Sequence, residues 1–243
     1  MQNSSKTFWK ILIIVCIPFI IFGCSKGSDS FYEAISLQKK TSINYVPKIG
    51  EGLSFFKRGT LTPTWQLEDI VLVPGLKLTD HHGRKFHTEE LRGKISVVAF
   101  LFTSCSGFCP ILAKKLKAME KELGGQEEIQ FIGITVDPDF DNPARLSEFG
   151  MNHGLNLNNR FMLLTGTKED IYNLVKNVFS SEIKQIDDNA IRKFAHTEHF
   201  YIIDQKMRLR SILNGTRINL AQKASTLISD LKREGSDEKN EFK

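Results

Sequence analysis

The chain has 243 residues, of which 41% are hydrophobic and 25% are charged. This composition suits one well-cored globular domain with some appendages and excludes general disorder. The formal net charge is +5, and the basic residues are scattered, which excludes the concentrated basic footprint of a nucleic-acid-binding protein. The four cysteines, at positions 16, 24, 105 and 109, are too few and too unevenly spread for a disulfide framework.

The N-terminal segment has the features of an export signal. Lys6 and Lys10 precede an apolar run over residues 11–22, which is too short to span a bilayer, since a spanning helix needs about 20 residues. The run ends in Ile-Phe-Gly-Cys, which resembles a bacterial lipobox with Cys24 as the lipidated residue, although Phe22 replaces the usual small residue. We predict a lipoprotein-type signal peptide over residues 1–23; the alternative is a short uncleaved anchor. Either way, the body is expected on the exoplasmic or periplasmic side of the cell envelope, anchored to the membrane.

Three further regions follow from composition. Residues 24–63 lack sustained periodicity and are interpreted as a linker or tether, partly ordered near Phe55. Residues 64–232 form the predicted domain, and residues 233–243 a charged, frayed tail.

The domain alternates strand and helix patterns. A short alternating strand (76–79) leads into a hairpin turn (80–83), and continuous apolar runs at 95–102 and 129–136 predict strands buried on both faces. Apolar residues at helical spacing predict a helix from Pro110 to Gly124. The remaining predicted elements are helices at 142–152, 168–179 and 218–231 and strands at 160–164, 199–204 and 209–213. We therefore predict an α/β fold in which a central mixed β-sheet is flanked by helices on both faces.

Cys105 and Cys109 lie between the first buried strand and the helix that follows it. In a parallel sheet this is the carboxyl end of a strand, where such folds place their functional sites. Because a helix N-terminus stabilises anions, we expect both thiols to ionise more readily than a free cysteine, whose pKa is about 8.5. The spacing lets both sulfurs face one point and also permits a disulfide. The alternative, two cysteines that only pack as small hydrophobic residues, is disfavoured by the Ser and Gly residues of the loop.

Three segments carry a resemblance to a known family: 100–110, with Phe-Leu-Phe-Thr-Ser-Cys and the Cys-x-x-x-Cys-Pro motif; 133–138, Gly-Ile-Thr-Val-Asp-Pro; and 196–204, His-Thr-Glu-His-Phe-Tyr-Ile-Ile-Asp. They resemble the Sco/SenC proteins, which are thioredoxin-fold copper chaperones for cytochrome c oxidase. The resemblance spans roughly residues 65–231. Two departures are Ser-Gly-Phe between the cysteines, where relatives often carry Pro-Asp, and Ala195, where many carry Asp.

The resemblance implies a thioredoxin-like fold and one copper ion per chain, Cu(I) or Cu(II), bound by Cys105, Cys109 and His196. It also implies delivery of copper to the copper-bearing subunit of cytochrome c oxidase, or reduction of that subunit's thiols, with other copper chaperones or thioredoxin-like reductases as further partners. The chain would then act as a metallochaperone more than as an enzyme.

The residue chemistry agrees with copper. Thiolates are soft ligands that suit Cu(I), and imidazole suits copper in either state, whereas structural zinc usually takes four protein ligands. His199 is the rival to His196 for the third ligand, and the register of the family motif favours His196. Asp137 follows a buried strand at the same sheet edge and is expected to support the metal site from beside it.

Two other functions remain open. One is a thiol-disulfide oxidoreductase, although such enzymes usually carry Cys-x-x-Cys and a proline before the facing strand. The other is a thiol peroxidase, since residues 78–94 resemble the entry of a peroxiredoxin; Arg160 is then the candidate arginine beside the reactive thiol.

Overall fold

The computed structural model describes residues 53–123, 125–179, 184–188, 191–195 and 198–241. Contacts divide the chain into two units, 1–39 and 40–243, and every described residue belongs to the second. The predicted signal peptide, Cys24 and His196 lie outside the described residues. Among the helices that are described, none is long and apolar enough to cross a membrane.

A seven-stranded mixed sheet forms the centre of the domain, in the order β11-β10-β5-β6-β7-β3-β4. The central strands β5, β6 and β7 are parallel, and the other neighbouring pairs are antiparallel. The strands of this sheet are β3 (Lys77–Asp80), β4 (Lys85–His87), β5 (Ile95–Leu101), β6 (Ile129–Thr135), β7 (Phe161–Thr165), β10 (His199–Ile203) and β11 (Leu209–Asn214). The predicted mixed sheet is confirmed. Two separate strand pairs are added to it: β1 (Phe55–Phe56) with β2 (Pro63–Thr64), and β8 (Lys184–Asp188) with β9 (Ile191–Ala195).

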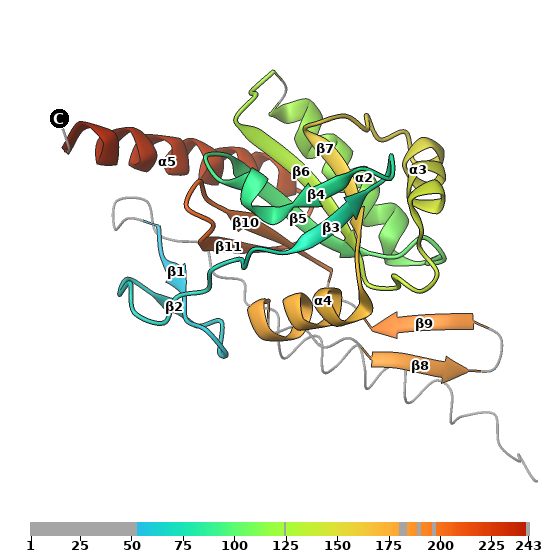
Figure 1. Ribbon diagram of the computed structural model, residues 1–243. Helices are drawn as coiled ribbons and strands as arrows, with labels where there is room; N and C mark the ends of the chain where they lie inside the picture. The colour runs from blue at the N-terminus through green and yellow to red at the C-terminus, as the bar shows by residue number, and fades with distance from the viewer. Residues whose placement is uncertain (1–52, 124, 180–183, 189–190, 196–197, 242–243) are drawn as a thin grey trace, which may run out of the picture. The chain divides into compact units, whose positions relative to one another are not determined.

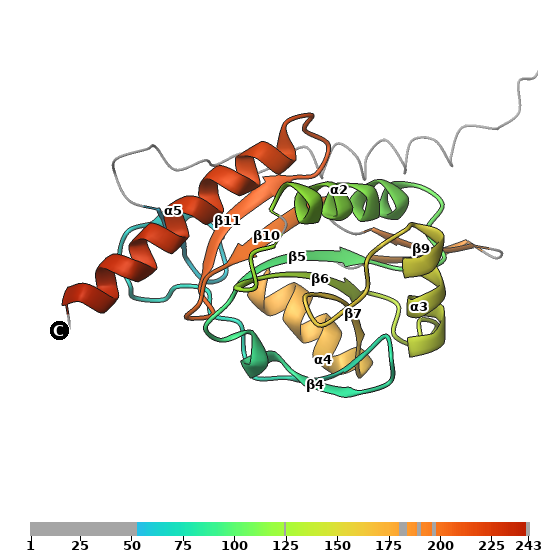
Figure 2. The same ribbon diagram turned by 90° about the horizontal axis from the view of Figure 1, so that it is seen from above.

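Helices cover both faces of this sheet, as predicted (Figures 1 and 2). The longer helices α2 and α5 contact each other on one face, and α4 lies on the other. The helical segments are η1 (Thr88–Leu91), α2 (Phe108–Glu122), α3 (Pro143–Asn152), α4 (Lys168–Asn173), its π-helical continuation η2 (Leu174–Val178), and α5 (Leu220–Glu241). Asn142 caps α3 by accepting a hydrogen bond from the Arg145 amide, with Pro143 in the first turn.

The core explains why the central strands read as continuous apolar runs. All seven residues of β5 and all seven of β6 are buried, because both strands are covered on both faces. On one face the apolar stripe of α2 is fully buried. On the other, Phe179, at the end of η2, contacts Phe100 and Tyr201 with ring centroids 5.2 and 4.5 Å away.

The packed body begins earlier in the chain than the boundary expected after residue 63. Leu53, Phe56 and Leu61 are buried in the hydrophobic core, with exposed fractions of 7%, 0% and 6%. The sequence pattern hides this packing because the three residues are spaced without helix or strand periodicity. Residues 53–63 therefore belong to the folded body and not to the linker.

The C-terminal helix extends beyond its predicted end at residue 231, to Glu241, so most of the predicted frayed tail is helical. Glu234 explains part of the extension, since its carboxylate accepts hydrogen bonds from the Leu53 amide at 3.0 Å and the Arg210 guanidinium at 2.7 Å. These partners are distant in sequence, so local composition does not reveal them.

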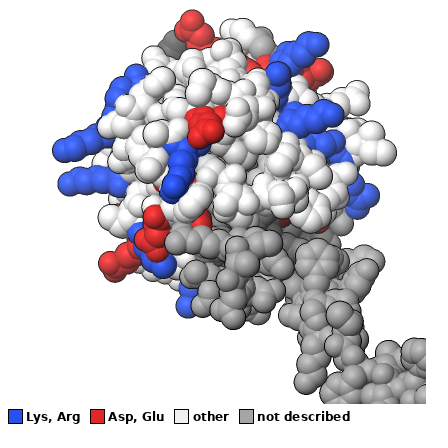
Figure 3. Space-filling model, turned by 90° about the vertical axis from the view of Figure 1, so that its right-hand side faces the viewer, with Lys and Arg blue, Asp and Glu red and all other residues white. Residues whose placement is uncertain are grey.

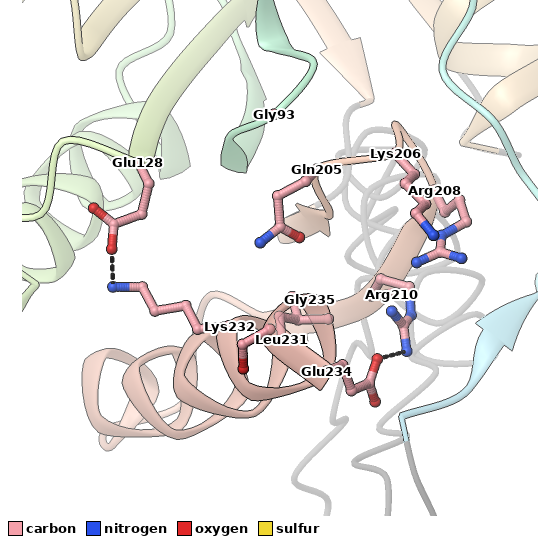
Figure 4. Close-up of a pocket in the computed structure, with 11 residues that line it drawn as sticks. Gly93, Glu128, Gln205, Lys206, Arg208, Arg210, Leu231, Lys232, Glu234 and Gly235 are labelled. Carbon is pink, nitrogen blue, oxygen red and sulfur yellow. Dashed lines mark hydrogen bonds and ion pairs between the residues drawn. The ribbon is translucent and has the colours of Figure 1, made fainter. Parts of the chain in front are cut away.

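A cavity of about 680 Å³ lies between α5 and the turn that joins β10 to β11 (Figure 4). It is at the end of the sheet where β5 and β6 begin. Its lining includes Lys232, paired with Glu128 at 2.5 Å, and Arg210, paired with Glu234. Figure 3 shows Lys and Arg side chains on both sides of the face that it draws, several of them side by side on the right, with acidic side chains among them.

Candidate metal centre

The two cysteines lie where β5 passes into α2. The helix begins at Phe108, two residues before the predicted start at Pro110, so Cys109 lies in its first turn and not in the loop. Cys109 is fully buried and Cys105 is half-buried, and both are reduced. The strand-to-helix turn thus brings one buried and one half-buried cysteine to the same edge of the sheet.

Main-chain amides bind both sulfurs. The Cys109 amide donates to Cys105 Sγ, and the Phe102 amide donates to Cys109 Sγ, each at 3.4 Å. Hydrogen bonds from amides favour the thiolate form that binds metal. Because the Cys109 residue contributes both its sulfur and the amide that holds the other sulfur, the two thiols form one local unit.

The expectation that both thiols ionise easily is wrong for Cys109. Burial raises the pKa of Cys109 well above its ordinary value, and the neighbouring Cys105 thiol raises it further. The Phe102 amide acts in the opposite direction but does not outweigh desolvation. The helix N-terminus therefore does not make Cys109 an acidic thiol in the metal-free protein.

The end of β6 adds buried polar groups beside the same turn. Asp137 is buried two residues after the strand, and its main-chain carbonyl accepts hydrogen bonds from the amides of Phe140 and Asp141 at 3.1 and 2.8 Å. Asp141, which the sequence reasoning missed, is fully buried and binds Thr103 and Thr135. The signal in the sequence that could have identified Asp141 is its position six residues after Thr135, the last residue of a buried strand.

His199 opens β10 and is buried, as expected for a histidine on a sheet face. It pairs with Asn214 of β11 and shares a sheet face with Tyr201, with ring centroids 6.4 Å apart. Within the described part of the chain its Nε2 has no hydrogen-bond partner. Because β10 is antiparallel to β5, His199 stands at the edge where β5 ends, which is the edge that carries the cysteines.

The third predicted ligand, His196, lies three positions before His199 and outside the described residues. Within the described residues, no group of three or more His, Cys, Asp or Glu side chains could hold a metal. The described residues alone thus supply a two-sulfur site, and His199 does not complete it.

Arg160, the candidate arginine for a peroxidase, is placed at the opposite end of the sheet. It precedes β7, which runs parallel to β5 and β6, and its guanidinium donates to the Gln126 carbonyl at 2.9 Å. The cysteines follow β5 at the other end. This separation removes Arg160 as the arginine beside the thiols, which counts against the peroxidase hypothesis.

A mixed sheet with helices on both faces and a reduced thiol pair between a central strand and the next helix defines a thiol-bearing protein of the thioredoxin-like class. The chain matches the SCO1/SenC family model over residues 69–233, and it belongs to that family. The Sco family consists of cytochrome c oxidase assembly proteins.

Individual proteins agree with this assignment. An SCO2-like protein of Rickettsia prowazekii is 32% identical over 146 residues, which cover 58% of this chain and 69% of the relative. A SCO1/SenC family lipoprotein from Bacillus anthracis has a similar structure, with a TM-score of 0.58 and 29% identity over 67% of this chain and 94% of that one. The copper-bound ScoI of Bradyrhizobium japonicum shares the fold, with a TM-score of 0.54 and 24% identity over 66% of this chain and 99% of that one.

Burial of His199 makes folding stability depend on pH. Desolvation lowers the pKa of His199 from 6.5 to about 4, so the folded state disfavours the protonated ring. Its contribution is complete above pH 6.5 and is lost as the pH falls from 6.5 toward 4, by about 3 kcal/mol in total. We expect His199→Phe to flatten this part of the stability profile, measured by urea unfolding between pH 4 and 7.

The matched control is His82→Gln, which changes an exposed histidine in the turn between β3 and β4. It should keep the loss of stability between pH 6.5 and 4, because the buried His199 is still present. A parental slope in His199→Phe would contradict the assignment.

Proposed function

We propose that the reduced protein binds one copper ion through Cys105, Cys109 and His196 and passes it to a copper-bearing subunit of cytochrome c oxidase. The observation that carries the proposal is the pair of reduced thiols, linked by the Cys109 amide, in a chain of the SCO1/SenC family. Two soft sulfur donors fit Cu(I), and an imidazole adds a donor that suits either copper state.

The different environments of the two sulfurs suit binding and release. Cys109 is fully buried, so it would hold the metal away from water, whereas the half-buried Cys105 is open to an acceptor. Because the pKa of Cys109 is raised, copper must displace its proton, and binding is expected to release protons and to strengthen as pH rises. Copper is cargo here, and its transfer requires only an exchange of ligands.

Exposed apolar side chains beside the thiols support a protein partner. Phe108 and Ile111, in the first turns of α2, are 40% and 46% exposed, and Cys109 lies between them in sequence. Large apolar residues next to a functional group are a common feature of protein contact surfaces. A copper-accepting domain docked there would approach Cys105 directly.

Reduction of a client disulfide is the second candidate function. The accessible Cys105 thiolate would attack the client disulfide, and Cys109 would then displace the client thiol, leaving a Cys105–Cys109 disulfide and a reduced client. The half-exposed position of Cys105 favours this order of attack. Both functions require the same reduced pair.

Membrane attachment through Cys24 is part of the proposal. The support is the apolar run that ends at Cys24, together with the description of the Bacillus anthracis relative as a lipoprotein. Cys24→Ser should block lipid attachment, and the protein should then leave the membrane fraction or accumulate unprocessed. The matched control, Cys16→Ser, changes a cysteine inside the apolar run and should behave as the parent does. Processed Cys24→Ser protein that still needs detergent for release would indicate another anchor.

The assignment of His196 generates the most specific prediction. His196→Ala should keep Cu(I) on the two thiolates but weaken Cu(II) binding at least ~10- to 100-fold, the range typical for groups that only support a ligand. The measurement is Cu(II) titration of the reduced full-length protein, followed by visible absorption and electron paramagnetic resonance.

His199→Phe is the matched control, because it removes a buried imidazole from the same chain segment. It should leave the copper spectrum unchanged. Loss of the signal in His199→Phe, with a normal signal in His196→Ala, would move the ligand assignment to His199.

A further inference from the structure

Asp141 is a buried carboxylate at the sheet edge that carries the cysteines. It lies six residues after the end of β6 and just before Asn142, the cap of α3, and its exposed fraction is 0%. Burying a carboxylate costs folding free energy unless hydrogen-bond donors surround it. The donors around Asp141 therefore indicate its role.

Three hydrogen-bond donors face the two oxygens of Asp141. The Thr103 amide donates to Oδ2 at 2.9 Å, the Thr135 hydroxyl donates to Oδ2 at 2.5 Å, and the Thr103 hydroxyl donates to Oδ1 through a short bond. Donors from the main chain and from hydroxyl groups match the acceptors of a carboxylate anion. The carboxylate thereby connects the ends of β5 and β6 to the start of α3.

These bonds act directly on the segment that holds the sulfurs. Thr103 follows Phe102, whose amide donates to Cys109 Sγ and whose carbonyl accepts from the Cys105 amide at 3.3 Å. Fixing both the amide and the hydroxyl of Thr103 therefore fixes the path of the chain from the end of β5 to Cys105. The carboxylate also adds a negative charge near Cys109, which raises the pKa of that thiol after the larger effects of burial and of Cys105.

We propose that Asp141 is a positioning residue for the metal site: it holds the Phe102–Cys105 turn in its metal-binding form, and its negative charge favours Cu(II) over Cu(I). The charge effect follows from Coulomb's law, because a nearby anion stabilises the more highly charged cation more strongly. This inference rests on the proposed copper function.

Asp204 provides a matched control within the same protein. Its carboxylate is also buried, with an exposed fraction of 1%, and accepts bonds from the amides of Lys206 and Arg208 and from the Arg208 and Arg210 guanidinium groups. It follows β10, at the end of the sheet opposite the cysteines. A role that is only structural would affect stability in the same way at both positions.

The test compares Asp141→Asn and Asp204→Asn in the reduced full-length protein. Cu(I) affinity is measured by competition with a chromophoric chelator, and Cu(II) affinity and geometry by titration with electron paramagnetic resonance. Asp141→Asn should lower the ratio of Cu(II) to Cu(I) affinity about 10-fold, the scale found for residues that support metal ligands. Asp204→Asn should lower stability and leave the ratio unchanged. An unchanged ratio in folded Asp141→Asn, or an equal change in both variants, would overturn the proposal.

Thr103→Val keeps the Asp141 charge and removes one hydrogen bond, so it covers the case in which Asp141→Asn does not fold. It should change the Cu(II) resonance spectrum by loosening the turn, and a parental spectrum would count against positioning.

Alkylation of the thiols by iodoacetamide supplies a readout without copper. It should be faster in Asp141→Asn, because weaker bonds to Thr103 loosen the turn that holds the buried Cys109 thiol. If the parent binds no copper, the proposed function fails, and the alkylation rate still decides the role of Asp141.

Discussion

The burial of β5 between β10 and β6 is the constraint on which the site depends. All seven residues of this strand are buried, and its parallel register with β6 brings Leu101 opposite Thr135. The turn after β5 therefore emerges beside the buried polar groups that follow β6, and α2 must begin there to cover the sheet. Cys105 and Cys109 are placed by this geometry, with main-chain amides already directed at their sulfurs.

Within this turn, desolvation outweighs the helix dipole. The dipole acts over the first turn of a helix and is worth about 1 kcal/mol or less at most sites, whereas full burial of a thiol shifts its pKa by much more. Cys109 is consequently a thiol that resists ionisation in the metal-free protein. In the proposed copper site, the metal would replace this proton and create the second thiolate on binding, as the proposed carrier function requires.

Local periodicity was sufficient to predict the elements around the site. The apolar runs that became β5 and β6 and the apolar stripe of α2 fall within two residues of their predicted bounds. Long-range contacts were not predictable in this way. The burial of Phe56, the extension of α5 through Glu234 and the bonds of Asp141 each join residues with no shared pattern in the sequence. The cysteine pair was recognised from spacing, whereas the state of Cys109 depended on burial that only the fold reveals. His196 stays a prediction that rests on the family motif.

The central claim is that the two thiols of Cys105 and Cys109 are the copper ligands. Cu(I) titration of the full-length protein in its reduced form, and in the form with a Cys105–Cys109 disulfide, tests it most directly. The account predicts one tightly bound Cu(I) per reduced chain and far weaker binding to the oxidised chain, because a disulfide removes both thiolates. Equal affinity of the two forms would contradict the account and show that copper binds elsewhere.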